Sequence, residues 1–475
     1  MSSEDESEKQ ATPTRSEVVV VMVPFPAQGH LNQLLHLSRL ISSHNIPVHY
    51  VSSTIHTRQA KLRDPLSTPN MMITFHDFSV PVFSSPPPDP HSSVKFPSHL
   101  LPTFYAALHL RSPVAQLLSA LYPTTKRLVI IYDSLIPSVI QDVASIPNGE
   151  AYSFQSLSAF RISSYYWESV GRPQGIDDQI AKEVPSRAST LTPEVMEFVN
   201  KQEEHTKYSS GAIFNTCQAI EAPFLQVLAK VNKKQWAIGP FNPIEISKNN
   251  SSRHECLEWL DKQAPDSVIF VSFGTTTSLT NEQIERLAVG LENSGQKFIW
   301  VLREADRGDI FAEDARVCNL PEDYEERIKL NDQGIIVRDW APQLEILAHT
   351  STGGFMSHCG WNSCMESITQ GVPIAAWPMH SDQPHNALLV TKVLKIGIFA
   401  RDWAHRDELV ESSTIEKAVR VLMATEEGEA LRKRTVELGK AVRRSVEEGG
   451  DSHMEIHDFI AHIKRLTGDS KVLSG

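Results

Sequence analysis

Apolar runs of strand length alternate with amphipathic helical segments along this chain, and that alternation restricts its fold more than any other feature. Residues 18–23 form a continuous apolar run, residues 31–43 carry apolar side chains at helical spacing, and residues 48–52 again favour a strand. A strand, a helix and a strand in this order predict a βαβ unit. Its buried strands are expected to be parallel.

A second unit of the same kind begins in the other half of the chain. Residues 268–272 and 298–302 favour strands, and between them Thr280 with Gln283 three residues later is a capping-box pattern that predicts a helix start. Four further apolar runs are each followed by a turn or helix signal; they are residues 128–132, 334–338, 354–357 and 373–377. Two doubly wound α/β domains are therefore predicted, with ligands at the carboxyl ends of the strands.

The length of the chain and its irregular stretches divide it into domains. At 475 residues it is too long for one hydrophobic core. Two prolines followed by a polar run interrupt the periodicity, which places a linker at residues 243–253 between domains at 17–242 and 254–455. Residues 1–16 are predicted to be a disordered acidic tail. The proline-rich stretch 81–102 is predicted to be a long surface loop of the kind that often serves binding.

Charge and cysteine content exclude several classes of function. Lysine and arginine total 45 against 57 acidic residues, and the formal charge of −12 argues against nucleic acid or anionic lipid as a partner. The polar N-terminus and the short apolar run after it predict neither a signal peptide nor a membrane span. The five cysteines are scattered and odd in number, as expected of reduced thiols in a cytoplasmic protein.

The segment from Trp340 to Gln383 combines groups that suit a nucleotide-sugar. Residues 354–357 are a predicted strand, and Asn362 with Ser363 opens a helix, so backbone amides and the helix dipole point at the turn between them. A diphosphate is expected to bind there. His358 offers a further hydrogen bond, and Thr275 provides the matching turn after the first strand of that domain.

The same segment offers an aromatic face and fixed hydrogen-bond acceptors. Trp340 precedes an Ala-Pro step, Glu366 lies one turn into the helix, and Asp382 with Gln383 follows the strand at 373–377. Taken singly, these residues equally fit a core tryptophan, a solvated helix carboxylate and an ordinary helix N-terminus. Taken together at this spacing, they favour a ligand site.

His30 and Asp133 are the candidate acid–base groups. Each follows a predicted strand, at residues 18–23 and 128–132, so both side chains are expected at the same edge of the sheet. There they would form an Asp-His pair with His30 as general base. A lone Gly-His is more often a capping or core histidine, and a lone Asp after a strand is usually an N-cap, so these alternatives stay open.

Other chemistries lack their signatures. A zinc site at His358, Cys359 and Cys364 is disfavoured because no second ligand pair at metal spacing occurs, and no metal is predicted. Neither a GxxxxGK phosphate loop, nor GxGxxG, nor the GxSxG elbow of an α/β-hydrolase is present.

With these residues on the page, the segment from Trp340 to Gln383 resembles the signature box of the plant UDP-dependent glycosyltransferases that act on small molecules. The resemblance extends from VPFPAQGHLNQ through IIYDSL and FVSFGT to the box. AQGHLNQLLHLS, FPSHLLPTFYAALHLR, MSHCGWNS and WPMHSDQPHNA are most similar to the zeatin O-glycosyltransferase group. Many family members have Pro where this chain has Gln33, so its first helix is expected to line the acceptor pocket differently.

The resemblance implies a GT-B fold, in which two Rossmann-like doubly wound domains face each other across a cleft and a C-terminal helix at 456–475 returns to the first domain. It implies an inverting transfer of glucose from UDP-glucose to a hydroxyl of a small hydrophobic plant metabolite, with a zeatin-type cytokinin as one candidate. His30 would remove the proton while Asp133 holds the imidazole. No cofactor or metal is expected, because the helix dipole and His358 would neutralise the diphosphate. A monomer is expected.

By position in the box, the donor residues divide into groups for base, diphosphate, ribose and sugar. Trp340 would stack on uracil, with Ala341 and Gln343 reading its edge; His358, Asn362, Ser363 and Thr275 would hold the diphosphate; Glu366 would bind the ribose; and Trp361, Asp382 and Gln383 would bind the sugar.

Acceptor residues are predicted from apolar stretches with a few polar points. The candidates are Gln28, Phe83, Phe154, Met379 and His380, which equally fit ordinary core and loop packing. The alternatives are a flavonoid or terpenoid acceptor and a xylosyl donor. A protein that binds nucleotide-sugars without turnover is the alternative from another class.

Overall fold

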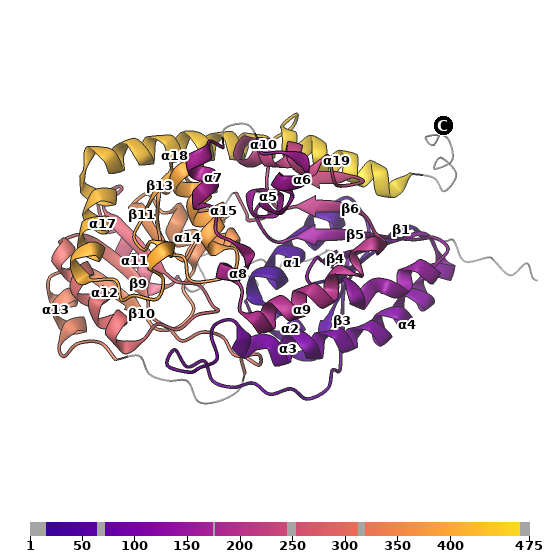
Figure 1. Ribbon diagram of the computed structural model, residues 1–475, viewed down its shortest axis with the longest axis horizontal. Coiled ribbons are helices and arrows are strands. Elements are labelled where there is room, and N and C mark those ends of the chain that lie inside the picture. The colour runs from indigo at the N-terminus through magenta and orange to yellow at the C-terminus, as the bar shows by residue number, and fades with distance from the viewer. Residues whose placement is uncertain (1–15, 64–71, 174–175, 245–252, 312–318, 466–475) are drawn as a thin grey trace, which may run out of the picture.

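The computed structural model describes residues 16–63, 72–173, 176–244, 253–311 and 319–465 (Figure 1). The predicted acidic tail at 1–16 lies outside the described residues except for Ser16, which begins the first strand. Most of the predicted linker at 243–253 also lies outside them, and the described chain on its two sides belongs to two different sheets.

The first sheet has seven parallel strands in the order β3-β2-β1-β4-β5-β6-β7. Its strands are β1 (Ser16–Val23), β2 (Val48–Ser53), β3 (Ile73–Phe78), β4 (Thr125–Asp133), β5 (Gly149–Gln155), β6 (Ser209–Phe214) and β7 (Gln235–Ala237). The α-helices around it are α1 (Gln28–Ser42), α2 (Thr54–Leu62), α3 (Leu101–Ala107), α4 (Arg111–Leu121), α5 (Ala159–Ser163), α6 (Trp167–Val170), α7 (Asp178–Glu183), α8 (Arg187–Thr190), α9 (Pro193–Glu203) and α10 (Gln218–Leu228). Alternate residues of β1 are buried in two different clusters, one on each face of the sheet, which explains its unbroken apolar sequence.

The second sheet has six parallel strands in the order β10-β9-β8-β11-β12-β13. Its strands are β8 (Val268–Ser272), β9 (Lys297–Val301), β10 (Gly334–Val337), β11 (Thr352–Ser357), β12 (Ile374–Ala376) and β13 (Gly397–Phe399). The helices of this half are α11 (Glu255–Leu260), α12 (Asn281–Ser294), α13 (Tyr324–Leu330), α14 (Gln343–Ala348), α15 (Trp361–Gln370), α16 (Gln383–Leu388), α17 (Ser412–Ala424), α18 (Glu426–Ser445) and α19 (Asp451–Lys464). The described chain also contains 3₁₀ helices at Ser98–Leu100, Leu108–Leu110, Tyr122–Thr124, Pro137–Ser145, Ser164–Tyr166, Thr206–Tyr208 and Trp403–His405, and a π-helix at Leu389–Val393.

The predicted strands are all present, with ends that differ by a few residues. The first helix begins at Gln28 instead of residue 31, so His30 lies inside its first turn. Thr280 caps α12 by accepting a hydrogen bond from the Gln283 amide at 3.2 Å, but the Gln283 side chain bonds Val410 instead of closing the capping box. The predicted loop at 81–102 ends earlier than expected, because a 3₁₀ helix at Ser98–Leu100 leads directly into α3 at Leu101.

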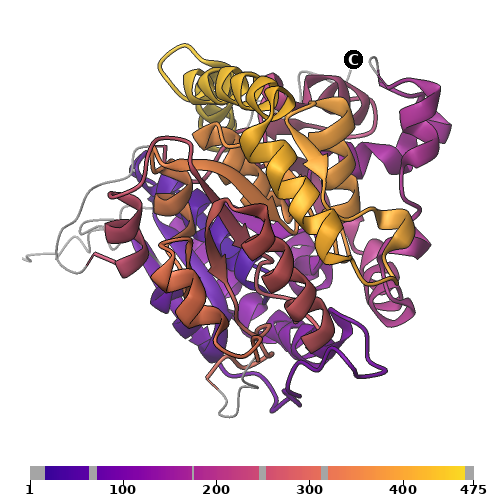
Figure 2. The same ribbon diagram turned by 90° about the vertical axis from the view of Figure 1, so that its left-hand side faces the viewer.

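The C-terminal helices join the two domains. Figure 1 shows α18 and α19 in yellow, running from the C-terminal domain across to the N-terminal one, and the view turned by 90° keeps them on the outer edge of both (Figure 2). The return helix begins at Asp451 and not at residue 456, and residues 466–475 lie outside the described chain. Phe459 and Ile463 are fully buried in the core of the first domain, and Trp236 Nε1 donates to Asp458 at 2.7 Å.

A second set of contacts lies at the interface of the two domains. One hydrophobic cluster contains Phe160 and Phe224 from the first domain with Cys364, Met365 and Leu389 from the second. Because this apolar surface is shared, the carboxyl edges of the two sheets are held against each other.

Among the described residues, no helix is both long enough and apolar enough to cross a membrane.

Phe459→Ala should weaken the docking of α19, because a fully buried aromatic ring is removed from the core. We expect the free energy of unfolding, measured by urea denaturation, to fall by about 3–5 kcal/mol. The control is Met454→Ala on the same helix, whose side chain is 53% exposed, so its effect should stay within about 0.5 kcal/mol. Equal losses in the two variants would contradict the docking.

Candidate functional site

His30 and Asp133 form the pair that the sequence predicts. His30 is in the first turn of α1 and Asp133 ends β4, and His30 Nδ1 lies 2.7 Å from Asp133 Oδ2. The carboxylate is fully buried, and the imidazole is 19% exposed. Asp133 Oδ1 also accepts a hydrogen bond from the Leu135 amide at 3.0 Å, so the turn-capping alternative holds as well. Since a carboxylate accepts, Nδ1 carries the proton and Nε2 is left as the basic atom.

The surroundings of His30 stabilise its charged form. Burial would lower the pKa of His30, but the charge and hydrogen bond of Asp133 and the charge of Asp382 raise it above the ordinary value for histidine. The Phe25 ring packs beside the imidazole, with centroids 5.1 Å apart. An imidazole held in one tautomer, with a buried carboxylate behind it, is equipped to take up a proton.

The predicted anion turn lies between β11 and α15. His358 follows β11, and its imidazole packs against Gly274 and Gly360, where an added Cβ would collide with the ring. Its Nδ1 is buried without a partner among the described residues, and burial lowers the pKa of His358 to about 4. The ring is therefore neutral near pH 7. The first amides of α15 have no acceptor within the helix, so they remain available to an anion.

Gln343 connects two residues of α15. Its Nε2 donates to Ser363 Oγ at 3.0 Å and to Glu366 Oε2 at 2.7 Å. Burial raises the pKa of Glu366 to about 7. Trp340, shortly before Gln343, is 43% exposed, whereas Ala341 is buried. The structure thus brings an exposed aromatic face and an oriented carboxyl group to one end of the second sheet.

Trp361 and Asn362 contact the other domain. Trp361 Nε1 donates to the Asn215 carbonyl at 2.8 Å, and Asn362 Nδ2 donates to the Gly29 carbonyl at 2.9 Å. The Trp361 N–H and one N–H of the Asn362 amide are therefore used between the domains, whereas Asn362 Oδ1 is buried without a partner among the described residues. The main-chain N–H groups at the start of α15 are open to a ligand.

Asp382 and Gln383 lie at the start of α16. Gln383 Oε1 accepts from the amides of Met379 and His380 at 2.9 and 3.1 Å, which leaves its Nε2 as a donor. Asp382 Oδ2 accepts from Asn386 at 2.7 Å. Burial raises the pKa of Asp382, and the nearby charges of Arg161 and His30 act against that rise.

The acceptor candidates do not form one surface. Phe154 is fully buried in the core of the first sheet, with its ring 5.7 Å from that of Phe241, a position that agrees with the alternative of core packing. Met379 packs against the core of the second domain. His380 is bonded to the hydroxyls of Thr276 and Thr277.

The other two candidates, Phe83 and Gln28, contact residues of α2. Phe83 is half-buried and stacks 6.4 Å from the His56 ring. Gln28 is buried and accepts from Gln59 at 2.8 Å. The unusual Gln33 is also buried, and accepts from Asn215 Nδ2 at 3.0 Å.

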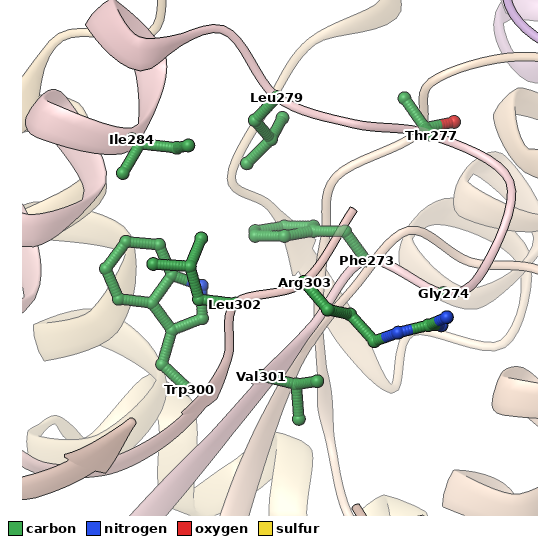
Figure 3. A pocket seen from close by; sticks show the side chains of 9 residues that line it. All are labelled: Phe273, Gly274, Thr277, Leu279, Ile284, Trp300, Val301, Leu302 and Arg303. Carbon is green, nitrogen blue, oxygen red and sulfur yellow. The ribbon is translucent and has the colours of Figure 1, made fainter. Parts of the chain in front are cut away.

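A small hollow lies beside the predicted turn at Thr275. Figure 3 shows Leu279, Ile284 and Trp300 facing one another across it, with Arg303 on the side of Gly274. Arg303 was not among the site residues predicted from the sequence. The signal was available, because Arg303 directly follows a predicted strand, as Asp133 does.

Comparisons with known proteins agree with this geometry. Residues 16–243 match the family described as "Glycosyltransferase, N-terminal domain", and residues 184–424 match "UDP-glucoronosyl and UDP-glucosyl transferase". The chain belongs to the UDP-glycosyltransferase family. It is 56% identical to a zeatin O-glucosyltransferase of Phaseolus lunatus, over 95% of this chain and 98% of the relative. It is 53% identical to a zeatin O-xylosyltransferase of Phaseolus vulgaris, over 95% of this chain and 99% of the relative.

Solved structures of the family have the same architecture. UGT2 of Phytolacca americana, complexed with UDP-2fluoro-glucose and pterostilbene, matches with a TM-score of 0.76 at 26% identity, over 94% of this chain and 99% of that one. The fold is therefore GT-B, as predicted. This UDP-glycosyltransferase transfers a sugar from a UDP-sugar to a hydroxyl of a small molecule.

Gly274→Ala should weaken UDP binding by about tenfold or more, because the new Cβ displaces the His358 ring and with it a hydrogen bond to a charged group. Calorimetric titration with UDP measures this. Gly295→Ala is the matched control: its φ is +67° against +77° at Gly274, and its added Cβ meets nothing within 4 Å. It should lose stability only; equal loss of UDP affinity would show that backbone strain, and not His358, is responsible.

Proposed function

We propose that this enzyme transfers glucose from UDP-glucose to the hydroxyl of a zeatin-type cytokinin, with inversion at the anomeric carbon. The observation that carries the transfer chemistry is the His30–Asp133 pair, 2.7 Å apart. His30 lies on α1, which is hydrogen-bonded to the anion turn through Gly29 and Asn362. The choice of acceptor is supported by the relatives named for zeatin, at 56% and 53% identity.

In the proposed mechanism, His30 Nε2 takes the proton of the acceptor hydroxyl as its oxygen attacks the anomeric carbon. The new carbon–oxygen bond forms on the face opposite the diphosphate, and the bond from that carbon to the diphosphate oxygen breaks. The proton stays on His30, and Asp133 stabilises the imidazolium. The sugar is therefore inverted.

UDP leaves into the turn formed by His358 and the start of α15. We infer that no metal takes part, because main-chain amides and the helix dipole offer the diphosphate a positive environment. His358 contributes a hydrogen bond and not a charge, since burial lowers its pKa to about 4.

The sugar and the ribose are assigned to side chains that still have hydrogen-bonding capacity. Gln383 Nε2 and the Asp382 carboxylate face the sugar in this proposal, and Glu366 accepts from the ribose. Glucose is the donor sugar in this proposal, and xylose is the alternative, because relatives of nearly equal identity are named for the two sugars. A flavonoid or terpenoid acceptor is the other candidate.

We further propose a monomeric enzyme in the cytoplasm. Cys217, Cys256, Cys359 and Cys364 are buried thiols, which agrees with a reducing compartment.

The function is tested by a panel of trans-zeatin, cis-zeatin, a flavonol and a hydroxylated terpenoid, each with UDP-glucose and UDP-xylose, with products read by mass spectrometry. We expect a zeatin with UDP-glucose to have the highest kcat/KM, at least about tenfold above the rest, and unchanged rates in EDTA. A flavonol or terpenoid as best acceptor would refute the cytokinin proposal. No product with any pair would favour a binding protein, and loss of rate in EDTA would refute the metal-free mechanism.

Asp133→Asn should change the pH dependence of transfer. A general base must be neutral to accept a proton. Asp133 is the main group that raises the pKa of His30, in opposition to the effect of burial. Wild-type kcat/KM should therefore rise with pH through that raised pKa. In the variant the acidic limb should move to lower pH, and the plateau should fall. His30→Ala is the control: it should bind UDP normally and lose about two to four orders of magnitude in kcat. An unmoved limb would mean that another group is the base.

A further inference from the structure

Arg63 is a nearly buried arginine that crosses from the N-terminal domain onto the C-terminal one. It follows α2, and its side chain is 11% exposed. Its two terminal nitrogens donate to the two carboxylate oxygens of Asp306 at 2.6 and 3.0 Å. Asp306 lies in the loop after β9 and is 9% exposed. A bidentate pair of this kind fixes direction as well as distance.

Asp306 itself is attached to the donor side of the site. Its amide donates to the Thr275 carbonyl at 2.7 Å, and Arg303 also ion-pairs with its carboxylate. His99 Nε2 donates to its carbonyl oxygen at 3.1 Å. Burial would raise the pKa of Asp306, but the hydrogen bond from Arg63 and the charges of both arginines hold it below its usual range. The carboxylate is therefore ionised and its position is fixed.

The guanidinium of Arg63 lies on the indole of Trp340. Its central carbon is 4.6 Å from the ring centroid, the geometry of a cation–π contact. Trp340 is nevertheless 43% exposed, so much of its surface remains open. A planar cation against an indole restricts the angle of the ring that a base would stack on.

A third contact reaches the helix of the general base. Arg63 Nη1 also donates to Gln28 Oε1 at 3.0 Å, and Gln59 donates to the same oxygen at 2.8 Å. Gln28 is the first residue of α1, two positions before His30. One side chain thus contacts the helix of His30, the Trp340 ring and, through Asp306, the turn at Thr275.

Building on the proposed function, we propose that Arg63 is a positioning residue for the UDP-sugar. It holds the Trp340 indole as a platform for uracil, and it ties that platform to the helix that carries His30. It acts through Trp340 and needs no contact with the reacting atoms. The alternative role for Arg63 is that of an ion pair that only stabilises the two-domain structure.

The test compares Arg63→Gln, Arg63→Lys, Trp340→Ala and the double variant Arg63→Gln/Trp340→Ala, with UDP affinity from calorimetry and with kcat and KM for UDP-glucose. Arg63→Gln should weaken UDP binding and raise KM about tenfold, with a smaller change in kcat. Arg63→Lys should not restore the affinity, because an ammonium makes neither the bidentate pair nor the planar contact. In the Trp340→Ala background, Arg63→Gln should add little further loss.

Arg111→Gln is the matched control. Arg111 makes a bidentate pair with Asp142 at 2.8 and 3.1 Å, but it lies within the N-terminal domain and is 50% exposed. It should leave UDP binding unchanged. Three outcomes would overturn the proposal: unchanged or tighter UDP binding in Arg63→Gln, full restoration by lysine, or losses that simply add in the double variant. If Arg63→Gln lowers the melting temperature but binds UDP normally, the proposal is likewise overturned. Since UDP binding needs no acceptor, failure of the zeatin assay leaves this test intact.

Discussion

The hydrogen bond from the Asn362 side chain to the Gly29 carbonyl joins the two helices on which the chemistry depends. Gly29 precedes His30 in the first turn of α1, and Asn362 is in the first turn of α15, whose free amides form the anion turn. At 2.9 Å this contact fixes the start of α1, where His30 lies, against the start of α15. Trp361 adds a second bond, to the Asn215 carbonyl. These bonds bring the edges of the two sheets together at one site. Helix α19, which follows the C-terminal domain, packs into the core of the N-terminal domain and stabilises this arrangement.

Burial lowers the pKa of two histidines at this edge, but their final pKa values move in opposite directions. It lowers the pKa of His358 to about 4, where no carboxylate contacts the ring, whereas Asp133 overcomes the same effect at His30. One imidazole is thus a neutral hydrogen-bond donor and the other a base that accepts a proton readily. The difference comes mainly from the buried carboxylate of Asp133 at the end of β4, with a smaller contribution from the charge of Asp382.

The sequence predicted the long, apolar elements and the residues that follow them, because period and position at a strand end are local properties. His30 and Asp133 were found in this way, and Thr280 was identified as a cap. The strands β3, β5, β6, β7 and β13 were missed: β7 and β13 are short, β6 begins Ser-Ser-Gly, and β3 and β5 mix polar with apolar residues instead of forming an apolar run. Phe154 lies inside β5, a strand that the sequence did not predict, and an apolar residue there looks the same in sequence whether it lines a pocket or packs in a core. Contacts between the domains, such as Arg63 with Asp306, carry no local signal at all.

The net charge and the ligand also set a requirement that the site meets locally. A protein with a formal charge of −12 repels an anionic UDP-sugar at long range, so attraction must come from groups within a few ångströms. The free amides of α15 supply partial positive charge without a mobile side chain. Beside the Thr275 turn, the two positive charges of Arg63 and Arg303 outnumber the one negative charge of Asp306, with which both pair. In the proposed mode of binding, the carboxyl groups of Glu366 and Asp382 face the hydroxyl-bearing parts of the ligand. On this proposal, the separation of donors from acceptors along the site, more than any one residue, orients the nucleotide-sugar with its anomeric carbon toward His30.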